Sequence, residues 1–316
     1  MLAIVAASLL AATGCATQGG LVPKGGYEAA RGREHPLSGK IWSPRDGAYG
    51  TPDALRARLT EARLVAIGET HDHPDHHRVQ ALLLGQWLEA HRDGAVAFEM
   101  LDETQAPALV PPPTSADELA ARVHWDESGW PDFALYRPVF ETALARGATI
   151  VAAHPRREHV RASMGALPPE AAQALALDTP LPAPARAALV EEIRESHCGH
   201  APEDMVEGMV RAQSFKDAWM ARAMADVGRP VVLIAGKGHI GEAGGVPLFL
   251  SRRGHPDVLT VALVEVRDAL ARPEDYPLRD VDFVVFTPRT SDADACEQFR
   301  EQLEQMKKSH AGQAGR

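Results

Sequence analysis

The stretch from Leu64 to His77 gathers residues that could carry protons or hold a metal ion. An apolar run of the length of a buried strand, Leu64–Gly68, is followed within nine residues by four histidines and three carboxylates. Open α/β sheets bind ligands just beyond the carboxyl ends of their strands. Imidazoles and carboxylates at such a place can act as general acids and bases or ligate a metal. The stretch therefore predicts a site.

Three later apolar runs also end in a histidine or a glutamate. Ala95–Glu99 ends in Glu99, Ala148–Ala153 is followed by His154, and Pro230–Ala235 leads through a glycine-rich turn to His239. Parallel strands place their carboxyl ends on the same side of a sheet. We therefore expect one common rim that carries five side chains: Glu69, His71, Glu99, His154 and His239.

The other histidines allow two interpretations each. His73 and His77 lie four residues apart with His76 between them, but the glutamate that follows the first histidine of the usual zinc helix is absent. They are either metal ligands or ordinary residues at a helix start. The run from His197 to His200 includes Cys198 and Gly199, so it is either a set of ligands or a helix C-terminus. The turn Gly236–His239 matches neither a P-loop nor a dinucleotide fingerprint.

Aromatic residues make up only 5% of the chain, yet five of them fall within 16 positions: Trp125, Trp130, Phe133, Tyr136 and Phe140. This cluster could form the walls of a site for a flat apolar cofactor with acidic substituents. Tyr136 would supply an oxygen ligand and Arg137 a cation. The alternative is a patch of the apolar core beneath a loop.

The alternation of apolar runs with amphipathic segments predicts an α/β fold, a mainly parallel sheet flanked by helices. Helices are expected at 52–62 and from Pro74 onward, and later strands at 259–264 and 283–286. Residues 156–228 are rich in alanine and proline and show helical periodicity, so we expect an inserted helical subdomain that forms a lid over the rim. A polar tail at 291–316 ends the chain.

The first residues are typical of an exported protein. Residues 2–12 have the length of a signal-peptide apolar region, and Ala12-Thr13-Gly14 before Cys15 resembles a lipobox, in which Cys15 would be lipidated. The alternative is a plain secretory signal with an incidental cysteine. Residues 16–38, rich in glycine, are expected to be a flexible tether. Cys198 and Cys296 then remain, and a disulfide between them is possible but not deducible from the sequence.

The net charge of −10 and the absence of any basic run longer than a pair argue against a nucleic-acid partner. The remaining question is which small molecule or metal the rim serves.

Several motifs together resemble the ChaN-type haem-binding lipoproteins, which belong with the Tiki proteases, TraB proteins and erythromycin esterases. They are Gly68-Glu69-Thr70-His71-Asp72 with His76, His77 and Gln80; Phe98-Glu99-Met100; Ser128-Gly129-Trp130-Pro131 leading to Tyr136; His197-Cys198-Gly199; Ala212-Gln213; and Gly238-His239. The resemblance covers about residues 60–250, within an expected ChaN-like domain at 39–290.

The resemblance implies an outer-membrane lipoprotein of haem or iron uptake that could pass its cargo to an outer-membrane transporter. It also implies haem held at a homodimer interface with a tyrosine as axial ligand. Tyr136 is the tyrosine inside a matching motif. The expected haem-binding residues are Tyr136, Trp130, Phe133, Arg137, His71 and His239.

A metal-dependent hydrolase is the alternative function. In that case Glu69, His71, Glu99, His154 and His239 would hold a divalent metal or act as base and stabiliser around an activated water. The sequence has no Gly-x-Ser-x-Gly motif of a serine hydrolase. The number of ionisable groups on the expected rim is what keeps this alternative open.

Overall fold

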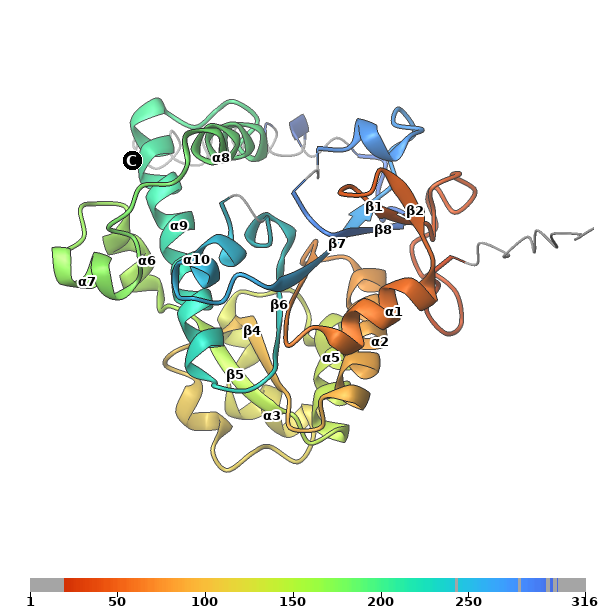
Figure 1. Ribbon diagram of the computed structural model, residues 1–316, viewed down its shortest axis with the longest axis horizontal. Coiled ribbons are helices and arrows are strands. Elements are labelled where there is room, and N and C mark those ends of the chain that lie inside the picture. Colours follow the sequence, from red (N-terminus) through yellow and green to blue (C-terminus); the bar gives the residue numbers. More distant parts are fainter. Residues whose placement is uncertain (1–19, 242–243, 278–279, 294–295, 298–299, 301–316) are drawn as a thin grey trace, which may run out of the picture.

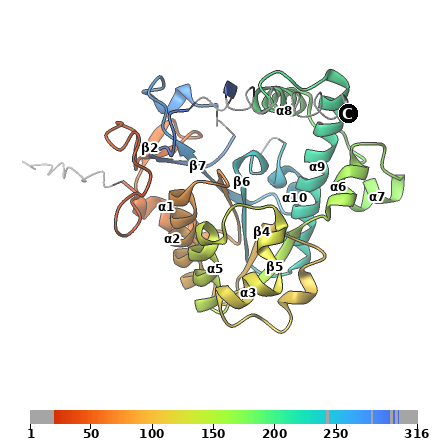
Figure 2. The same ribbon diagram turned by 180° about the vertical axis from the view of Figure 1, so that it is seen from behind.

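The computed structural model describes residues 20–241, 244–277, 280–293, 296–297 and 300. The expected signal peptide and lipobox at 1–15, and most of the polar tail at 291–316, lie outside the described residues. Figure 1 shows a central twisted sheet with helices packed on both of its faces, and Figure 2 shows the same layers from behind.

The described part of the sheet has eight strands in the order β2-β1-β8-β7-β3-β6-β4-β5. The neighbours from β8 to β5 pair in parallel, while β1 is antiparallel to β8 and to β2. This confirms the predicted α/β class and mainly parallel sheet. The strands are β1 (Ile41–Ser43), β2 (Ala48–Gly50), β3 (Leu64–Glu69), β4 (Ala95–Asp102), β5 (Thr149–His154), β6 (Val231–Gly236), β7 (Val258–Glu265) and β8 (Phe283–Thr287).

Successive strand residues point to opposite faces, so each central strand contributes to two apolar layers. In β3, Val65 and Ile67 pack with α2 and α5, whereas Ala66 packs with the residues of α9 and α10 on the other face. One face carries α1 (Pro52–Glu61), α2 (Pro74–Ala90), α3 (Ala116–Arg122), α4 (Trp125–Ser128) and α5 (Phe133–Ala145), and the other carries α9 (Glu203–Asp226) and α10 (Val246–Arg252). Because helices cover both faces of the sheet, the sequences of the central strands are continuous apolar runs and do not alternate with polar residues.

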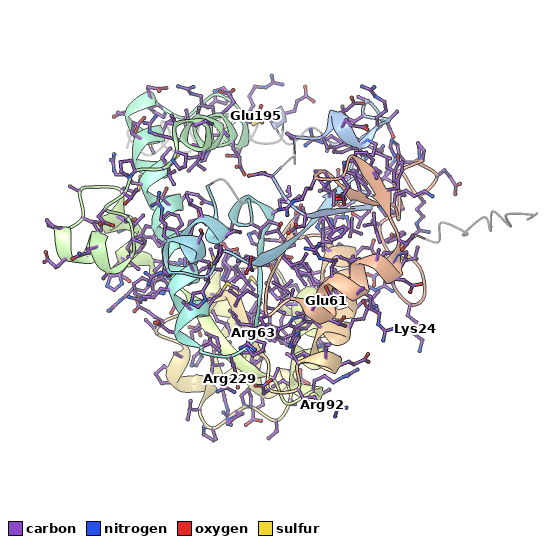
Figure 3. The ribbon with its side chains drawn as sticks, viewed as in Figure 1. Lys24, Glu61, Arg63, Arg92, Glu195 and Arg229 are labelled. Atoms are coloured by element: carbon purple, nitrogen blue, oxygen red, sulfur yellow. A yellow bond between two sulfur atoms is a disulfide. The ribbon has the colours of Figure 1, made fainter. Side chains whose placement is uncertain are left out.

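The segment between β5 and β6 is helical. It contains α6 (Arg157–Ser163), α7 (Pro169–Ala174), α8 (Ala183–Ser196) and α9, and proline occupies the first turn of α7 and α8, where a missing N–H costs no helical hydrogen bond. The remaining short elements are the 3₁₀ turns η1 (Ala106–Leu109), η2 (Lys237–His239) and η3 (Pro273–Asp275). In Figure 3, Glu195 of α8 lies at the opposite end of the molecule from Arg63 and Arg229, which precede β3 and β6. Helix α8 therefore lies on the side of the strands' carboxyl ends.

The segment expected to be a flexible tether is packed against the domain over its described residues, 20–38. Leu21, Ala29 and Leu37 are buried, and the backbone N–H groups of Glu28 and Ala29 both donate to the carboxylate of Asp75, each at 2.8 Å. The tether interpretation is corrected for this part, since three of its apolar residues reach the core, although Val22 stays exposed. The glycine content predicted a flexible segment, but hydrogen bonds to the carboxylate of Asp75 in the first turn of α2, Pro74–Ala90, fix its backbone.

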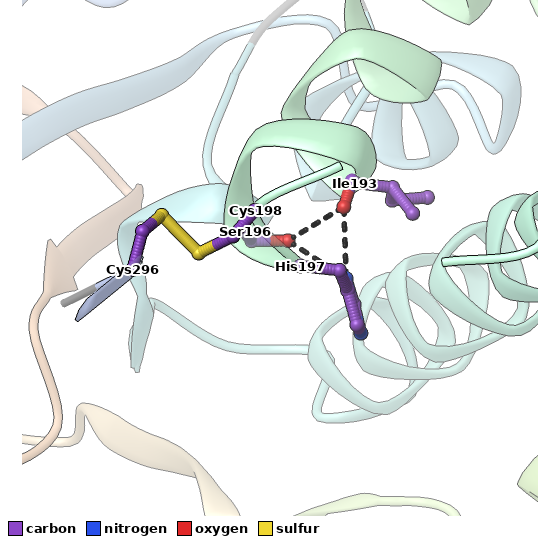
Figure 4. Close-up of a disulfide and its surroundings, with 5 residues drawn as sticks. All are labelled: Ile193, Ser196, His197, Cys198 and Cys296. Atoms are coloured by element: carbon purple, nitrogen blue, oxygen red, sulfur yellow. Dashed lines mark hydrogen bonds between the residues drawn. A yellow bond between two sulfur atoms is a disulfide. The ribbon is translucent and has the colours of Figure 1, made fainter. Parts of the chain in front are cut away.

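A disulfide joins Cys198 to Cys296, 98 residues later, and ties the turn after α8 to the C-terminal segment (Figure 4). The run from His197 to His200 is thus a helix C-terminus and not a set of ligands. His197 Nδ1 lies 2.8 Å from the carbonyl oxygen of Ile193, and Cys198 and Gly199 have the left-handed backbone that ends helices. Within the described part of the chain, no helix is long and apolar enough to cross a membrane.

Candidate functional site at the carboxyl ends of the strands

The predicted common rim is present, because β3, β6, β4 and β5 are consecutive parallel neighbours. Glu69 and His154 are the last residues of β3 and β5, Glu99 lies near the end of β4, and His239 is in the η2 turn after β6. His71 Nε2 lies 3.9 Å from Glu99 Oε2. Residues that are up to 170 positions apart in the sequence, such as Glu69 and His239, therefore face one region of the sheet edge.

Beside β6, a buried histidine lies between two buried carboxylates. His239 Nδ1 is 2.5 Å from Asp217 Oδ1, and His239 Nε2 is 3.1 Å from Glu99 Oε1. The other oxygen of Glu99 accepts a hydrogen bond of 2.7 Å from the backbone N–H of Gly236. A Cβ atom added at Gly236 would lie 2.9 Å from His71 Nε2, so glycine allows the His71 ring to keep this position.

The charges of this group follow from burial and from the neighbours. Burial lowers the pKa of His239, but Glu99 and Asp217 more than offset this and raise it to about 9. Burial raises the pKa of Glu99, yet His239 holds it well below the usual range. The pKa of Asp217 is raised, with burial as the main cause. His239 is thus an imidazolium at neutral pH, paired with the Glu99 carboxylate.

Beside β3, Glu69 holds two histidines and a tyrosine. His71 Nδ1 lies 2.8 Å from Glu69 Oε1, and His77 Nδ1 lies 2.8 Å from Glu69 Oε2. His77 Nε2 is 3.0 Å from the carbonyl oxygen of His71. Burial raises the pKa of Glu69, but its two histidine partners lower it below the ordinary value, and Glu69 in turn raises the pKa of His77 against the effect of burial.

Tyr136 lies inside this group and is fully buried. Its hydroxyl donates to Glu69 Oε1 at 3.2 Å, and its ring packs 4.0 Å from that of His77. Burial, and then the charges of Glu69 and Glu99, raise the pKa of Tyr136 far above its ordinary value. In this structure Tyr136 is a neutral phenol that donates a hydrogen bond.

The two remaining histidines of the turn fasten it to β8. His73 Nδ1 accepts from the N–H groups that open α2, and its Nε2 donates to the carbonyl oxygen of Pro288 at 2.9 Å. His76 Nδ1 accepts from the N–H of Thr70 at 2.9 Å, and its Nε2 lies 3.0 Å from Thr287 Oγ1. Both rings are buried, and burial lowers the pKa of His76 well below its ordinary value. Their role is structural, as helix-start residues.

No group of three or more His, Cys, Asp and Glu side chains in the described residues is arranged to hold a metal ion. The rim carboxylates instead lie against imidazoles and backbone N–H groups, although Glu69 Oε2, 2.8 Å from His77 Nδ1, makes no aligned hydrogen bond. A divalent metal would have to displace these partners.

A cavity of about 670 Å³ opens beside the rim at the carboxyl ends of β4 and β5. Its size falls in the range of about 300–1,000 Å³ that is typical of cofactor and small-molecule sites. Trp130 forms part of its wall and contacts the His71 ring edge to face at 4.8 Å. The other lining residues are mixed in character. They include three carboxylates, two guanidiniums, two imidazoles and two apolar side chains: Glu99, Asp102, Glu127, Arg122, Arg157, His124, His154, Met100 and Val123.

The aromatic cluster divides between core and cavity. Trp125, Phe133, Tyr136 and Phe140 pack on one another beneath α5, and Arg137 on the outer side of this helix donates to Asp117. Only Trp130, of the residues expected to form a cofactor wall, lines the cavity. The structure therefore places Phe133 and Arg137 away from it.

Four residues of the site were not found from the sequence: Asp217, His124 and the two arginines of the cavity, Arg122 and Arg157. Asp217 was hidden in α9, although an acidic residue beside the buried Phe215, Ala218 and Ala221 is a signal of a paired buried charge. His124 gives a weaker signal, since nothing in its sequence context indicates its left-handed backbone (φ 50°). Such a conformation is rare for residues other than glycine and often occurs at functional sites.

One family model and several solved structures match this chain. The family model described as "Haem-binding uptake, Tiki superfamily, ChaN" matches residues 55–250. The structure titled "Cofacial heme binding to ChaN of Campylobacter jejuni" matches with a TM-score of 0.64 at 22% identity, and the match covers 78% of this chain and 95% of that one. No curated protein matches significantly.

Two further structures match more weakly. The type III effector HopBA1 has a TM-score of 0.43 at 13% identity and covers 75% of this chain and 92% of its own. A mutant of the erythromycin esterase EreC in its open conformation has a TM-score of 0.41 at 17% identity and covers 78% and 81%, respectively.

Proposed function

Because the chain belongs to the ChaN family of haem-binding uptake proteins in the Tiki superfamily, we propose that it binds haem, and that it does so in the cavity beside β4 and β5. The observation that carries this proposal is the combination of groups around the cavity. A flat tryptophan, two guanidiniums and two imidazoles, together with three carboxylates, surround a space of cofactor size.

These residues fit the chemistry of haem. Trp130 and Met100 can contact the apolar macrocycle, and the imidazoles of His124 and His154 are donors that haem iron accepts. Arg122 and Arg157 can pair with its propionates once they turn from their present partners, Glu118 and the carbonyl oxygens of Ala108, Pro111 and Ser128. Bound haem would supply a ligand-accepting iron and two carboxylates. The protein's part is to enclose the ring and to neutralise those carboxylates.

The rim supports the cavity from one side. His71 contacts Trp130, and its Nδ1 is held by Glu69, which is itself fixed by His77 and Tyr136. His239 acts at one remove, through Glu99, which both lines the cavity and pairs with the imidazolium. His71 and His239 are thus positioning residues in this proposal.

The tyrosine ligand expected from the sequence remains a prediction for Tyr136, and the geometry opposes it. The hydroxyl is buried, it already serves Glu69, and its raised pKa disfavours the phenolate that ligates ferric iron. To bind iron, Tyr136 would have to leave the core.

A dimer and a membrane anchor complete the proposal. The cavity opens on the surface, so a second copy of the chain could cover a haem bound there. We expect hemin to increase the mass measured by light scattering from that of a monomer to that of a dimer. An unchanged mass at saturating hemin would contradict the dimer.

The Cys198–Cys296 disulfide supports a location outside the cytoplasm, because disulfides persist in oxidising compartments. With lipidation at Cys15, this favours an outer-membrane lipoprotein that receives or delivers haem beside a transporter. Cys15→Ser should release the protein from the membrane fraction. Retention of the variant in that fraction would argue for another anchor.

Hydrolysis at the rim is the second candidate function. The Asp217–His239–Glu99 and His71–Glu69 groups are favoured by their geometry for proton transfer, with Glu99 and His154 also lining the cavity. The metal-dependent form would need a divalent ion among side chains that now pair with one another. It is therefore the weaker candidate.

One titration separates the two functions. Hemin is added to the purified chain and its absorbance spectrum is followed. A saturable spectrum with a defined stoichiometry supports haem binding. If hemin gives no saturable change, a divalent metal co-purifies, and Glu69→Gln abolishes cleavage of an ester or peptide, the hydrolase replaces the haem proposal.

A further inference from the structure

The described chain enters the domain at one edge of the sheet. Gly20 is the first described residue, and the N–H of Leu21 donates to the carbonyl oxygen of Gly39 at 2.8 Å, two residues before β1. In both ribbon views the start of the described chain lies on the side of β1 and β2 (Figures 1 and 2). The cavity lies beside β4 and β5, at the other end of the strand order. The N-terminal segment and the cavity are therefore at opposite edges of the sheet.

Two of the large apolar side chains that the described residues expose lie at the N-terminal side. Val22 is 48% exposed, and Tyr49 of β2 is 45% exposed. Val22 packs beside Gly39, because a Cβ atom added at Gly39 would lie 3.6 Å from Val22 Cγ2. Tyr49 pairs with Trp42 across β1 and β2, and their ring centroids are 5.2 Å apart. Exposed tyrosine next to apolar groups is typical of surfaces that lie at the boundary between water and lipid.

The charge of this region is opposite in sign to that of the chain. Residues 20–50 carry five basic and three acidic side chains, a net charge of +2, whereas the whole chain carries −10. Lys24 is exposed and Lys40 is half-buried, and within the described residues neither ammonium group has an ion-pair partner. Lysines beside a membrane are attracted to anionic headgroups and extend their ammonium groups toward them. We call the surface formed by Val22, Lys24, Lys40 and Tyr49 the N-terminal edge.

The length of chain before this edge limits which face of the domain can approach a membrane. Four residues, 16–19, lie between Cys15 and Gly20. Even at full extension, the five Cα steps from Cys15 to Gly20 span at most about 18 Å. A domain of this size has a radius of gyration of about 19 Å and is therefore about 50 Å across. An anchor at Cys15 thus holds the N-terminal edge close to the bilayer and leaves the opposite edge of the sheet far from it.

We propose that the N-terminal edge lies on an anionic lipid bilayer and orients the domain so that the cavity faces away from the membrane. Val22 and Tyr49 enter the headgroup region, and Lys24 and Lys40 pair with lipid phosphates. The proposal rests on the lipid anchor at Cys15 proposed above. The acyl chains supply most of the membrane affinity through their buried methylenes, whereas the edge selects one orientation. The cavity is then open to the aqueous side, where haem or a second copy of the chain reaches it.

The test attaches a nitroxide spin label at single positions of the full lipidated chain: Val22→Cys, Tyr49→Cys and Val110→Cys. Val110 is the matched control, because it is 76% exposed and directly follows η1, next to the cavity. The chains are reconstituted in vesicles of phosphatidylethanolamine with about one quarter phosphatidylglycerol. We expect a water-soluble paramagnetic relaxant to collide with the labels at 22 and 49 at least about threefold less often than on the unlipidated Cys15→Ser chain in solution. The label at 110 should show no such protection.

Charge reversal separates the edge from the anchor. A chain with Lys24→Glu and Lys40→Glu should still float with the vesicles and should lose the protection at Val22, because its carboxylates are repelled by anionic headgroups. The control is the chain with Lys24→Arg and Lys40→Arg, which keeps both charges and should keep the protection. Vesicles of phosphatidylcholine alone should give weaker protection at Val22 than the anionic vesicles.

Three results would overturn the docking surface and leave the anchor in place. They are labels at 22 and 49 that stay as accessible on floated chains as in solution, equal protection at 110, and protection without vesicles that grows with protein concentration, which would assign the edge to contact between two copies. If Tyr49→Cys does not fold, as judged by circular dichroism, acetylation of Lys24 and Lys40 in the unsubstituted chain replaces it, and slower acetylation on vesicles is expected. A chain that does not float with vesicles refutes the anchor, and the docking surface with it.

Discussion

The two halves of the rim differ in how their ionisable groups are partnered. Around β3 and β6, Glu69 pairs with His71, and His239 pairs with Glu99, which reaches across from β4 and also borders the cavity, so each buried charge is compensated by a neighbour. Around β4 and β5, His124 and His154 border an open cavity, and within the described part of the chain His154 has a hydrogen bond on Nδ1 alone. The first half is built for positioning, whereas the second is built to receive a ligand.

The largest expected effect is on the unfolding free energy, when one member of the buried charge pairs is removed. Glu99→Ala would leave the His239 imidazolium with Asp217 alone and the Gly236 N–H without its acceptor. Removal of one partner of a buried ion pair typically destabilises a protein by about 3–5 kcal/mol, so urea unfolding should show a loss of this size. Asp117→Ala, which removes an exposed partner of Arg137, is the control and should change little. Equal midpoints for Glu99→Ala and wild type would contradict the paired-charge account.

The pH dependence of the unfolding free energy tests the same half of the rim. The pKa of His239 is raised to about 9, so the stability it contributes is fully present below its unfolded pKa of about 6.5 and is lost as the pH rises through about 9. The difference in unfolding free energy between wild type and His239→Gln should therefore shrink between about pH 7 and pH 10, by about 2–4 kcal/mol. A constant difference across this window would show that His239 is neutral when folded.

Substitutions in the half of the rim beside the cavity should change hemin affinity and leave the unfolding midpoint nearly unchanged. Trp130→Ala removes the aromatic wall, so hemin affinity should fall about tenfold, or about 1.4 kcal/mol, with little change in the unfolding midpoint. Phe133→Leu is the matched control, because Phe133 packs in the core against Trp125 and Phe140. That variant should lose stability and keep its hemin affinity. The reverse pattern would place the cofactor wall in the core cluster.

The smallest effect belongs to the residue between the two halves. Tyr136→Phe removes one hydrogen bond to Glu69 and keeps the ring against His77, so it should cost about 0.5–1.5 kcal/mol of unfolding free energy. Its hemin spectrum should match that of wild type. A lost spectrum with unchanged stability would return Tyr136 to the role of iron ligand.

Much of the architecture could be predicted because the parallel strands are long apolar runs that end in glycine or ionisable residues. The short strands β1 and β2 were missed, since three-residue segments carry no periodicity. The rim followed from one topological rule applied to Glu69, Glu99, His154 and His239. Which rim residues pair with one another could not be predicted, because the pairing depends on Asp217 of α9 and on the burial of these side chains.

The aromatic cluster shows the same limit. Composition alone left core and cofactor wall equally possible for Trp125, Trp130, Phe133 and Tyr136, and the structure divides the cluster between them. The pairing of Cys198 with Cys296 likewise needed coordinates, because two cysteines 98 residues apart give no indication of their distance in space.

A crystal structure of the chain grown with hemin tests the central claim most directly. The account predicts porphyrin density in the cavity beside Trp130, enclosed by the residues that line it. Haem bound on another surface, with this cavity holding only solvent, would contradict it.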